Sequence, residues 1–191
     1  MSGHRAPDLL LNAEQTMLSK TALGFIRERA PAARLRSFRD SGDEVGFSKA
    51  LWAEMAELGW LGLQIPEEYE GLGLGFFDLC VVLEQTGREL MPEPFISTLL
   101  LGAQALLLGG TASQKRGLLP GVSAGELILA LGYEEGEAPV RLVRAAGEFL
   151  LSGEKLQVLD AHVADRLIIS AQDEDGATSL LLVDPAAEGV G

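Results

Sequence analysis

Apolar positions in the first 120 residues recur with the spacing of α-helices. Asn12 and Gln15 predict an N-cap with a capping box, and the apolar positions that follow repeat every three or four residues until Pro31. Further helices are expected at residues 47–58, at 76–90 and at 94–108, the last apolar on nearly all sides. A short helix is expected from Thr111 or Ser113 to Pro120, and residues 60–75, rich in Gly, Pro and Glu, are expected to form an ordered loop.

The hydrophobic period changes after residue 125. Short apolar runs bounded by Gly, Asp, Glu or Ser predict strands at residues 127–131, 140–143, 149–151, 156–159, 167–170 and 180–183, with residues 152–154 as a hairpin turn. The sequence thus predicts an α+β chain, with an all-helical domain over residues 1–124 and an incomplete antiparallel β-barrel-like domain over residues 125–191. The last run leaves strand edges without partners, so either a partner covers them or the natural product is longer, and we favour the second.

Charge argues against several classes of partner. The chain holds 15 Lys+Arg and 28 Asp+Glu, a net charge of −13, and residues 121–191 hold four basic against thirteen acidic side chains. Nucleic acids and anionic lipids bind basic surfaces, so no nucleic-acid partner is predicted. The longest apolar stretch, residues 96–110, is short of the ~20 residues that span a bilayer, and no signal peptide is visible. We therefore expect a soluble protein without a membrane span.

The cysteine and the two histidines do not predict a catalytic or a metal-binding site. The single cysteine, Cys80, lies in an apolar run, which predicts core packing and fits a reducing, cytoplasmic location. His4 and His162 lie far apart in the sequence and neither has the spacing of metal ligands, so no metal site is predicted.

Residues 57–73 (ELGWLGLQIPEEYEGLG) closely resemble a segment of the acyl-CoA dehydrogenase family that lies between its second and third helices. Residues 110–115 with 118–121, residues 152–155 and residues 164–165 are similar, in the same order, to later segments of that family. Residues 87–95 (GRELMPEPF) are similar to a branch often linked to sterol side-chain or other bulky acyl-CoA substrates, commonly as hetero-oligomers. The resemblance covers essentially the whole chain.

The resemblance implies a helical N-terminal domain, a middle β domain and a C-terminal four-helix domain, the last of which is missing from this sequence. It implies α,β-dehydrogenation of an acyl-CoA thioester with hydride transfer to FAD. The catalytic carboxylate normally comes from the missing domain, so no catalytic residue is assigned. By resemblance, Phe95, Thr98 and Leu101 line the acyl-chain pocket, since they share one face of the helix at residues 94–108. From the residues alone, plain core packing fits these three positions equally well.

Two segments match the flavin contacts of the family. The resemblance implies that FAD meets Leu131, Tyr133 and Glu134 in the first segment, and Leu159 and Asp160 in the second. Both segments depart from the family: Tyr133 stands where Thr is usual, the Gly-Ser-Asp part is missing, and the stacking Trp and the following hydroxyl are replaced by Gln157 and Leu159. The carboxylates would also meet a pyrophosphate of like charge. These departures argue against family-typical FAD binding by this chain alone, and Tyr133 alternatively packs at a strand end.

Three hypotheses follow. The chain is the N-terminal half of a FAD-dependent acyl-CoA dehydrogenase; or it is a flavin-less partner subunit that completes another chain's pocket in a hetero-oligomer; or it is an acyl-CoA-binding or scaffolding fragment without chemistry of its own. The expected partners are an acyl-CoA and, in a homo- or hetero-oligomer, another chain of the same family.

Overall fold

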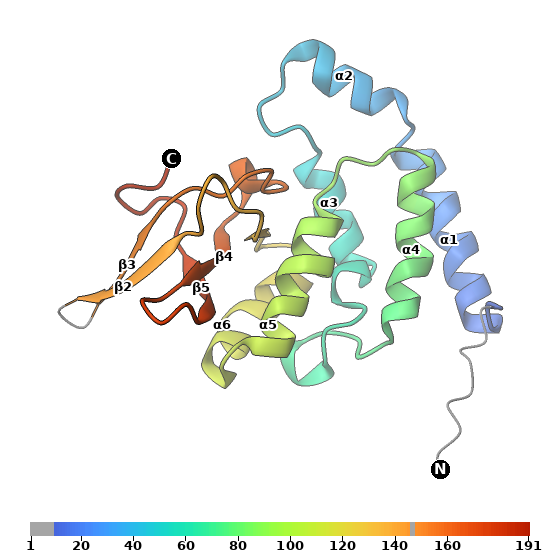
Figure 1. Ribbon diagram of the computed structural model, residues 1–191. Coiled ribbons are helices and arrows are strands. Elements are labelled where there is room, and N and C mark those ends of the chain that lie inside the picture. Colours follow the sequence, from blue (N-terminus) through green and yellow to red (C-terminus); the bar gives the residue numbers. More distant parts are fainter. Residues whose placement is uncertain (1–9, 146–147) are drawn as a thin grey trace.

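The described chain begins with helices and ends with a sheet (Figure 1). The computed structural model describes residues 10–145 and 148–191, so residues 1–9, which include His4, and residues 146–147 lie outside it. The α-helices are α1 (Ala13–Arg29), α2 (Ala33–Ser41), α3 (Lys49–Glu57), α4 (Phe76–Arg88), α5 (Gln104–Gly109) and α6 (Ala112–Ser123). A π-helical segment, η3 (Ile96–Ala103), precedes α5, and 3₁₀ turns lie at η1 (Trp60–Gly62), η2 (Glu67–Tyr69) and η4 (Ala161–Val163). The strands are β1 (Leu129–Gly132), β2 (Arg141–Ala145), β3 (Glu148–Ser152), β4 (Arg166–Gln172) and β5 (Thr178–Val183). The predicted fold class, a helical part followed by a partial β part, is confirmed.

Capping signals predict the helix starts correctly. Asn12 accepts a hydrogen bond from the Gln15 main-chain N–H at 2.8 Å, and the Gln15 side chain accepts one from the Asn12 N–H at 3.1 Å. This reciprocal pair is the predicted capping box of α1. Thr111, and not Ser113, is the N-cap of α6, where it forms a second capping box.

Pro120 lies inside α6, so the prediction that it ends this helix is wrong. A proline within a helix removes one main-chain donor and strains the preceding turn. Leu119 and Val122, the residues next to it on the inner face, are both fully buried, and α6 continues to Ser123. Burial of that face outweighs the cost of the proline.

Helix α2 is not among the predicted elements. None of its residues is buried, so it lacks the apolar stripe by which the other helices are recognised. It projects from the top of the molecule, away from the bundle formed by α1, α3, α4 and α6 (Figure 1).

Residues 60–75 are ordered, as predicted, but they belong to the core and do not merely connect two helices. Trp60, Leu61 and Ile65 are buried among α1, α3 and α6. Gly71 lies so close to this turn that a Cβ would stand 1.9 Å from the Ile65 carbonyl oxygen. Only glycine allows that approach.

The sheet is mixed, whereas the sequence predicts an antiparallel arrangement. Its strands lie in the order β1-β4-β2-β3, and β5 pairs with β4. The β1–β4 and β2–β4 pairs are parallel, and the β2–β3 and β4–β5 pairs are antiparallel. Two neighbouring strands can run parallel only if a long connection joins them. The connection between β1 and β4, which contains β2 and β3, is long enough for this.

The predicted strand at residues 156–159 is absent and the predicted hairpin turn at residues 152–154 is wrong. The antiparallel partner of β3 is β2, which precedes it. After β3 only Lys155 makes an isolated bridge, with Glu135. Gln157 and Asp160 have positive φ angles of 51° and 57°, which interrupt any extended conformation.

One core extends through the helices and the sheet. Thr98 of η3 lies against Leu129 of β1, and a Cβ on Gly102 would stand 2.4 Å from the Leu129 Cβ. Asp165 accepts a hydrogen bond from the Ile128 N–H at 2.8 Å. A domain boundary between residues 124 and 125 therefore stays a prediction. Within residues 10–145 and 148–191, no helix is long and apolar enough to cross a membrane.

Candidate functional site

A hollow of about 630 Å³ lies where the helices meet the segment after β3. We name it the α4–η4 hollow. Its walls come from α2, the end of α4 and the turn that follows it, the start of η3, and the two residues before η4. The lining residues are Leu35, Leu83, Thr86, Gly87, Leu90, Met91, Pro92, Glu93, Phe95, Ile96, Leu100, Leu159 and Asp160. The lining is mostly apolar, as is usual for sites that take small molecules.

The hollow brings together three of the predicted site residues. Phe95, predicted to contact substrate, is buried with its ring edge-on to Trp52 at a centroid distance of 5.2 Å. Leu159 and Asp160, predicted to contact the cofactor, line the same hollow. The Ser97 hydroxyl donates a 2.5 Å hydrogen bond to the Asp160 carboxylate. This bond joins η3 to the residues before η4 and fixes one wall against the other.

Thr98 and Leu101 are not among the residues that line the α4–η4 hollow, so their contact with the substrate stays a prediction. Thr98 is fully buried, and its hydroxyl lies within hydrogen-bond distance of both the main-chain N and O of Leu129. Leu101 is half-buried and is not among the residues that line the hollow. The i→i+5 bonds of a π-helix widen each turn by roughly one residue, which breaks the spacing expected for an α-helix.

Leu131, Tyr133 and Glu134 lie outside the α4–η4 hollow. Leu131 is half-buried in β1, opposite Ile168 of β4. Tyr133 and Glu134 are exposed in the loop that follows β1. The Glu134 carbonyl accepts a hydrogen bond from the Leu156 N–H at 3.0 Å, so the main chains of the two predicted flavin segments are joined.

A buried lysine next to this loop is already paired. The Lys155 ammonium donates to the Glu135 carboxylate and, at 2.8 Å, to the Ser170 hydroxyl. The hydrogen bond from Lys155 lowers the pKa of the Glu135 carboxyl, and it outweighs the opposing effect of desolvation. Because its donors are held in this way, Lys155 is not a free cation for an anionic ligand.

An ion pair that no sequence pattern predicts joins α2 to the wall of the hollow. Arg34 of α2 donates to the Glu93 carboxylate at 2.5 Å, with side chains that are 20% and 0% exposed. The second carboxylate oxygen of Glu93 is buried and has no hydrogen-bond partner among the described residues. The pair spans 59 residues of sequence, and no local signal links them.

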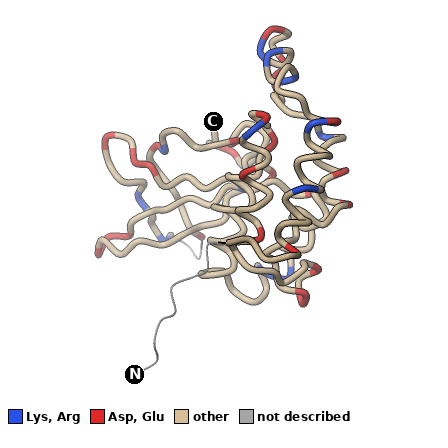
Figure 2. Tube along the Cα trace, turned by 90° about the vertical axis from the view of Figure 1, so that its right-hand side faces the viewer, with Lys and Arg blue, Asp and Glu red and all other residues tan. Residues whose placement is uncertain are grey.

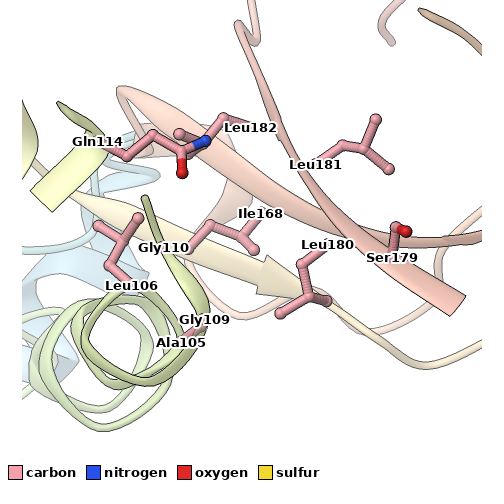
Figure 3. Close-up of a pocket in the computed structure, with 10 residues that line it drawn as sticks. All are labelled: Ala105, Leu106, Gly109, Gly110, Gln114, Ile168, Ser179, Leu180, Leu181 and Leu182. Carbon is pink, nitrogen blue, oxygen red and sulfur yellow. The ribbon is translucent and has the colours of Figure 1, made fainter. Parts of the chain in front are cut away.

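A second hollow, of about 320 Å³, lies between α5, the start of α6 and β5 (Figure 3). Leu106 and Gln114 face Leu180 and Leu182 across it, and Gly109 and Gly110 leave room beside them. None of the predicted site residues lines it. Basic positions are dispersed among acidic ones in the trace of the described chain and do not gather into one basic face (Figure 2).

The comparisons with known proteins decide the family. Residues 12–126 match the family model "Acyl-CoA dehydrogenase, N-terminal domain". The chain belongs to the acyl-CoA dehydrogenase family. It is 30% identical over 141 residues to the acyl-CoA dehydrogenase FadE27 of Mycobacterium tuberculosis, which covers 73% of this chain and 38% of that relative. It is 28% identical to the mitochondrial isovaleryl-CoA dehydrogenase of Pongo abelii, over 94% of this chain and 43% of the relative.

Solved acyl-CoA dehydrogenase structures agree with the fold. A variant of the Tcur3481–Tcur3483 steroid ACAD superposes with a TM-score of 0.81 at 37% identity, over 92% of this chain and 49% of that chain. The ChsE4–ChsE5 complex of Mycobacterium tuberculosis superposes with a TM-score of 0.87 at 24% identity, over 96% and 50%. This chain spans about half the length of these solved chains and about two fifths of the length of the curated relatives.

The side chains at the family's flavin positions do not fit FAD well. Glu134 and Asp160 are carboxylates, which when ionised accept hydrogen bonds but donate none. The Asp160 carboxylate is already engaged by Ser97. A pyrophosphate or a flavin ring edge needs donors, and the nearby ammonium of Lys155 is taken by Glu135 and Ser170. Of the positions that the resemblance assigns to the flavin, Glu134, Leu159 and Asp160 therefore offer no side-chain donor, whereas the Tyr133 hydroxyl and the main-chain N–H groups can donate.

Proposed function

We propose that this chain is the acyl-binding part of an acyl-CoA dehydrogenase that oxidises the Cα–Cβ bond of an acyl-CoA thioester. The observation that carries the proposal is the α4–η4 hollow, which is lined both by Phe95 from the expected substrate helix and by Leu159 and Asp160 of the expected flavin segment. In this reading the acyl chain occupies the hollow and the thioester lies near Asp160.

The size and lining of the hollow support an apolar ligand. Its volume of about 630 Å³ lies within the range of roughly 300–1,000 Å³ that is usual for small-molecule sites. The similar proteins include an isovaleryl-CoA dehydrogenase and a steroid ACAD, the second at 37% identity. We therefore propose a bulky acyl group as the substrate, in the cytoplasm, with FAD as the electron acceptor of the whole enzyme.

A second candidate is favoured by the flavin positions. In this alternative the chain is a partner subunit without a flavin of its own, and another acyl-CoA dehydrogenase chain supplies the cofactor. The carboxylates of Glu134 and Asp160 and the exposed apolar side chain of Leu159 support it, because none of them donates a hydrogen bond. Two of the similar solved structures also carry two-component names, ChsE4–ChsE5 and Tcur3481–Tcur3483.

Binding of acyl-CoA tests the site itself. Ile96 is 53% exposed in the wall of the hollow, so Ile96→Trp fills the hollow without disturbing the core. Leu108 is 85% exposed and lies outside the hollow, so Leu108→Trp is the matched control. By calorimetry we expect Ile96→Trp to weaken acyl-CoA binding about tenfold, which is about 1.4 kcal/mol, with no change for Leu108→Trp. Equal affinities in all three proteins would refute the assignment of the hollow.

Flavin content separates the two candidates. The chain is purified alone and after co-expression with a homologous acyl-CoA dehydrogenase chain, and the visible absorbance of bound flavin is measured. Stoichiometric flavin in the chain alone supports a self-sufficient flavoprotein. Flavin that is retained only in the co-expressed complex supports the partner-subunit candidate.

A further inference from the structure

Residues 31–46 form a segment that the core holds weakly, through the half-buried Val45 near its end. Ala30 before it and Phe47 after it are buried, but none of the sixteen residues between them is buried. The segment carries α2, which stands apart from the other helices in both views of the chain (Figures 1 and 2). Segments with little buried surface open at low free-energy cost.

Side-chain polar contacts connect α2 to the rest of the described protein at one point. The Arg39 guanidinium bonds to the adjacent Asp40, and the Ser41 hydroxyl bonds to the Phe38 carbonyl, so both contacts stay within the helix. Arg34, by contrast, donates to the Glu93 carboxylate at 2.5 Å in the wall of the α4–η4 hollow. The Glu93 carboxylate also lies 3.4 Å from the Ser48 N–H, at the start of α3.

The turn that follows α2 has the geometry of a hinge, whereas at the other end of the segment Pro31 fixes φ after α1. Gly42 and Gly46 have φ angles of 67° and 75°, and a Cβ on either would meet no atom within 4 Å. Glycine adopts positive φ at little cost, and the hydrogen bonds from the Val45 and Gly46 N–H groups to the Asp43 carboxylate are exposed, so this turn changes its main-chain angles more readily than the core does.

We infer that α2 is a hinged wall of the α4–η4 hollow, that the Arg34–Glu93 ion pair is its latch, and that this wall limits the bulk of the apolar group that the hollow admits. The role in admitting a ligand rests on the proposed function. Leu35 is the residue through which α2 lines the hollow. The other lining residues lie on α4, on η3, on the turn between them and just before η4, so a movement of α2 widens the hollow without disturbing the core.

The closed position is favoured because Glu93 is buried. When α2 moves away, the Glu93 carboxylate loses its contact with Arg34. The second oxygen of this carboxylate already has no hydrogen-bond partner among the described residues. An isolated buried charge is unfavourable, so the ion pair closes the wall in the absence of ligand.

Hydrogen exchange of the full chain, read by mass spectrometry, tests the latch. Arg34→Ala removes the cation of the ion pair. Glu93→Gln removes the anion and leaves no unpaired carboxylate, so this variant provides the test if Arg34→Ala folds poorly. Arg36→Ala is the control, because Arg36 is exposed on the same helix and forms no ion pair with any described residue. We expect exchange of the α2 amides to rise about tenfold in Arg34→Ala and Glu93→Gln, with α1 and α4 unchanged and Arg36→Ala equal to the wild type. Unchanged exchange in both latch variants would overturn the inference, whatever the chain binds.

Affinities for two probes test the role of the wall. Octanoyl-CoA is slim, and the CoA ester of a bile acid carries a bulky polycyclic acyl group. We expect the latch variants to gain about fivefold in affinity for the polycyclic probe relative to octanoyl-CoA, because only the bulky group needs the wider hollow. A relative affinity that stays the same, while α2 exchange rises, would overturn the role of the wall. If α2 exchange rises but neither probe binds any of the proteins, the proposed function fails and the latch stands.

Discussion

Leu61 gives the sharpest test of the core that supports the site. It is 0% exposed in η1, and a Cβ on Gly125 would lie 3.2 Å from its Cδ1 and 3.5 Å from Cδ1 of Trp52. Leu61→Ala removes three buried carbons, worth about 2.4 kcal/mol at about 0.8 kcal/mol each. The cavity that remains adds to this, because α3, η1 and the turn at Gly125 hold their positions around it. We therefore expect a loss of about 3–5 kcal/mol in the free energy of unfolding.

The matched control is Leu58→Ala, three residues earlier, where the leucine is 46% exposed. We expect this change to cost less than about 1 kcal/mol, since little apolar surface is lost. Urea unfolding followed by far-ultraviolet circular dichroism gives both values from the transition midpoints at a common slope. A loss below about 0.5 kcal/mol for Leu61→Ala, or equal losses in the two variants, would show that residues 60–65 do not form the core described above.

Three further predictions use the same unfolding measurement. Gly71→Ala should cost about 1–3 kcal/mol or more, because the new Cβ would stand 1.9 Å from a backbone oxygen, whereas Gly87→Ala in α4, with open space around it, should stabilise by about 0.5–1 kcal/mol. Thr111→Ala should cost about 1 kcal/mol by removing the N-cap of α6, and Ser113→Ala should cost less than half of that. Glu135→Gln should make stability less dependent on pH between about 5 and 3: the lowered pKa of this carboxyl stabilises the fold above the ordinary glutamate value of about 4.3, and that contribution is lost as pH falls through the folded-state pKa. Equal acid sensitivity in the variant and the wild type would contradict the pairing with the buried lysine.

Elements determined by neighbouring residues are predictable from the sequence. The capping boxes at Asn12 and Thr111 and the apolar stripe of α4 are local patterns, and each predicts its helix. Helix α2 is not predictable in this way, because its connection to the protein is the ion pair between Arg34 and Glu93, far away in the sequence. Pro120 shows the converse, since a local signal that ends most helices is overridden by the burial of its neighbours.

The family resemblance and the geometry agree at three positions of the candidate site. Phe95, Leu159 and Asp160 line one hollow, and the resemblance names all three. The predicted grouping of Thr98 and Leu101 with Phe95 assumes α-helical spacing, whereas η3 has π-helical turns, and the local sequence does not reveal this change. Residues such as Leu35 come to the hollow through tertiary structure alone.

The polar side chains around the α4–η4 hollow direct their hydrogen bonds into the protein. The Thr86 hydroxyl donates to the Leu83 carbonyl at 2.9 Å, Asp160 accepts from Ser97, and the Glu93 side chain is fully buried against Arg34. An apolar group in the hollow is therefore recognised by shape and by the surface it buries, and these side chains offer it no free donor. The hydrogen bonds to the thioester carbonyl that the proposed dehydrogenation requires have to come from main-chain groups or from polypeptide other than these residues. Acyl-CoA affinity and flavin content are therefore two independent measurements of the proposed function.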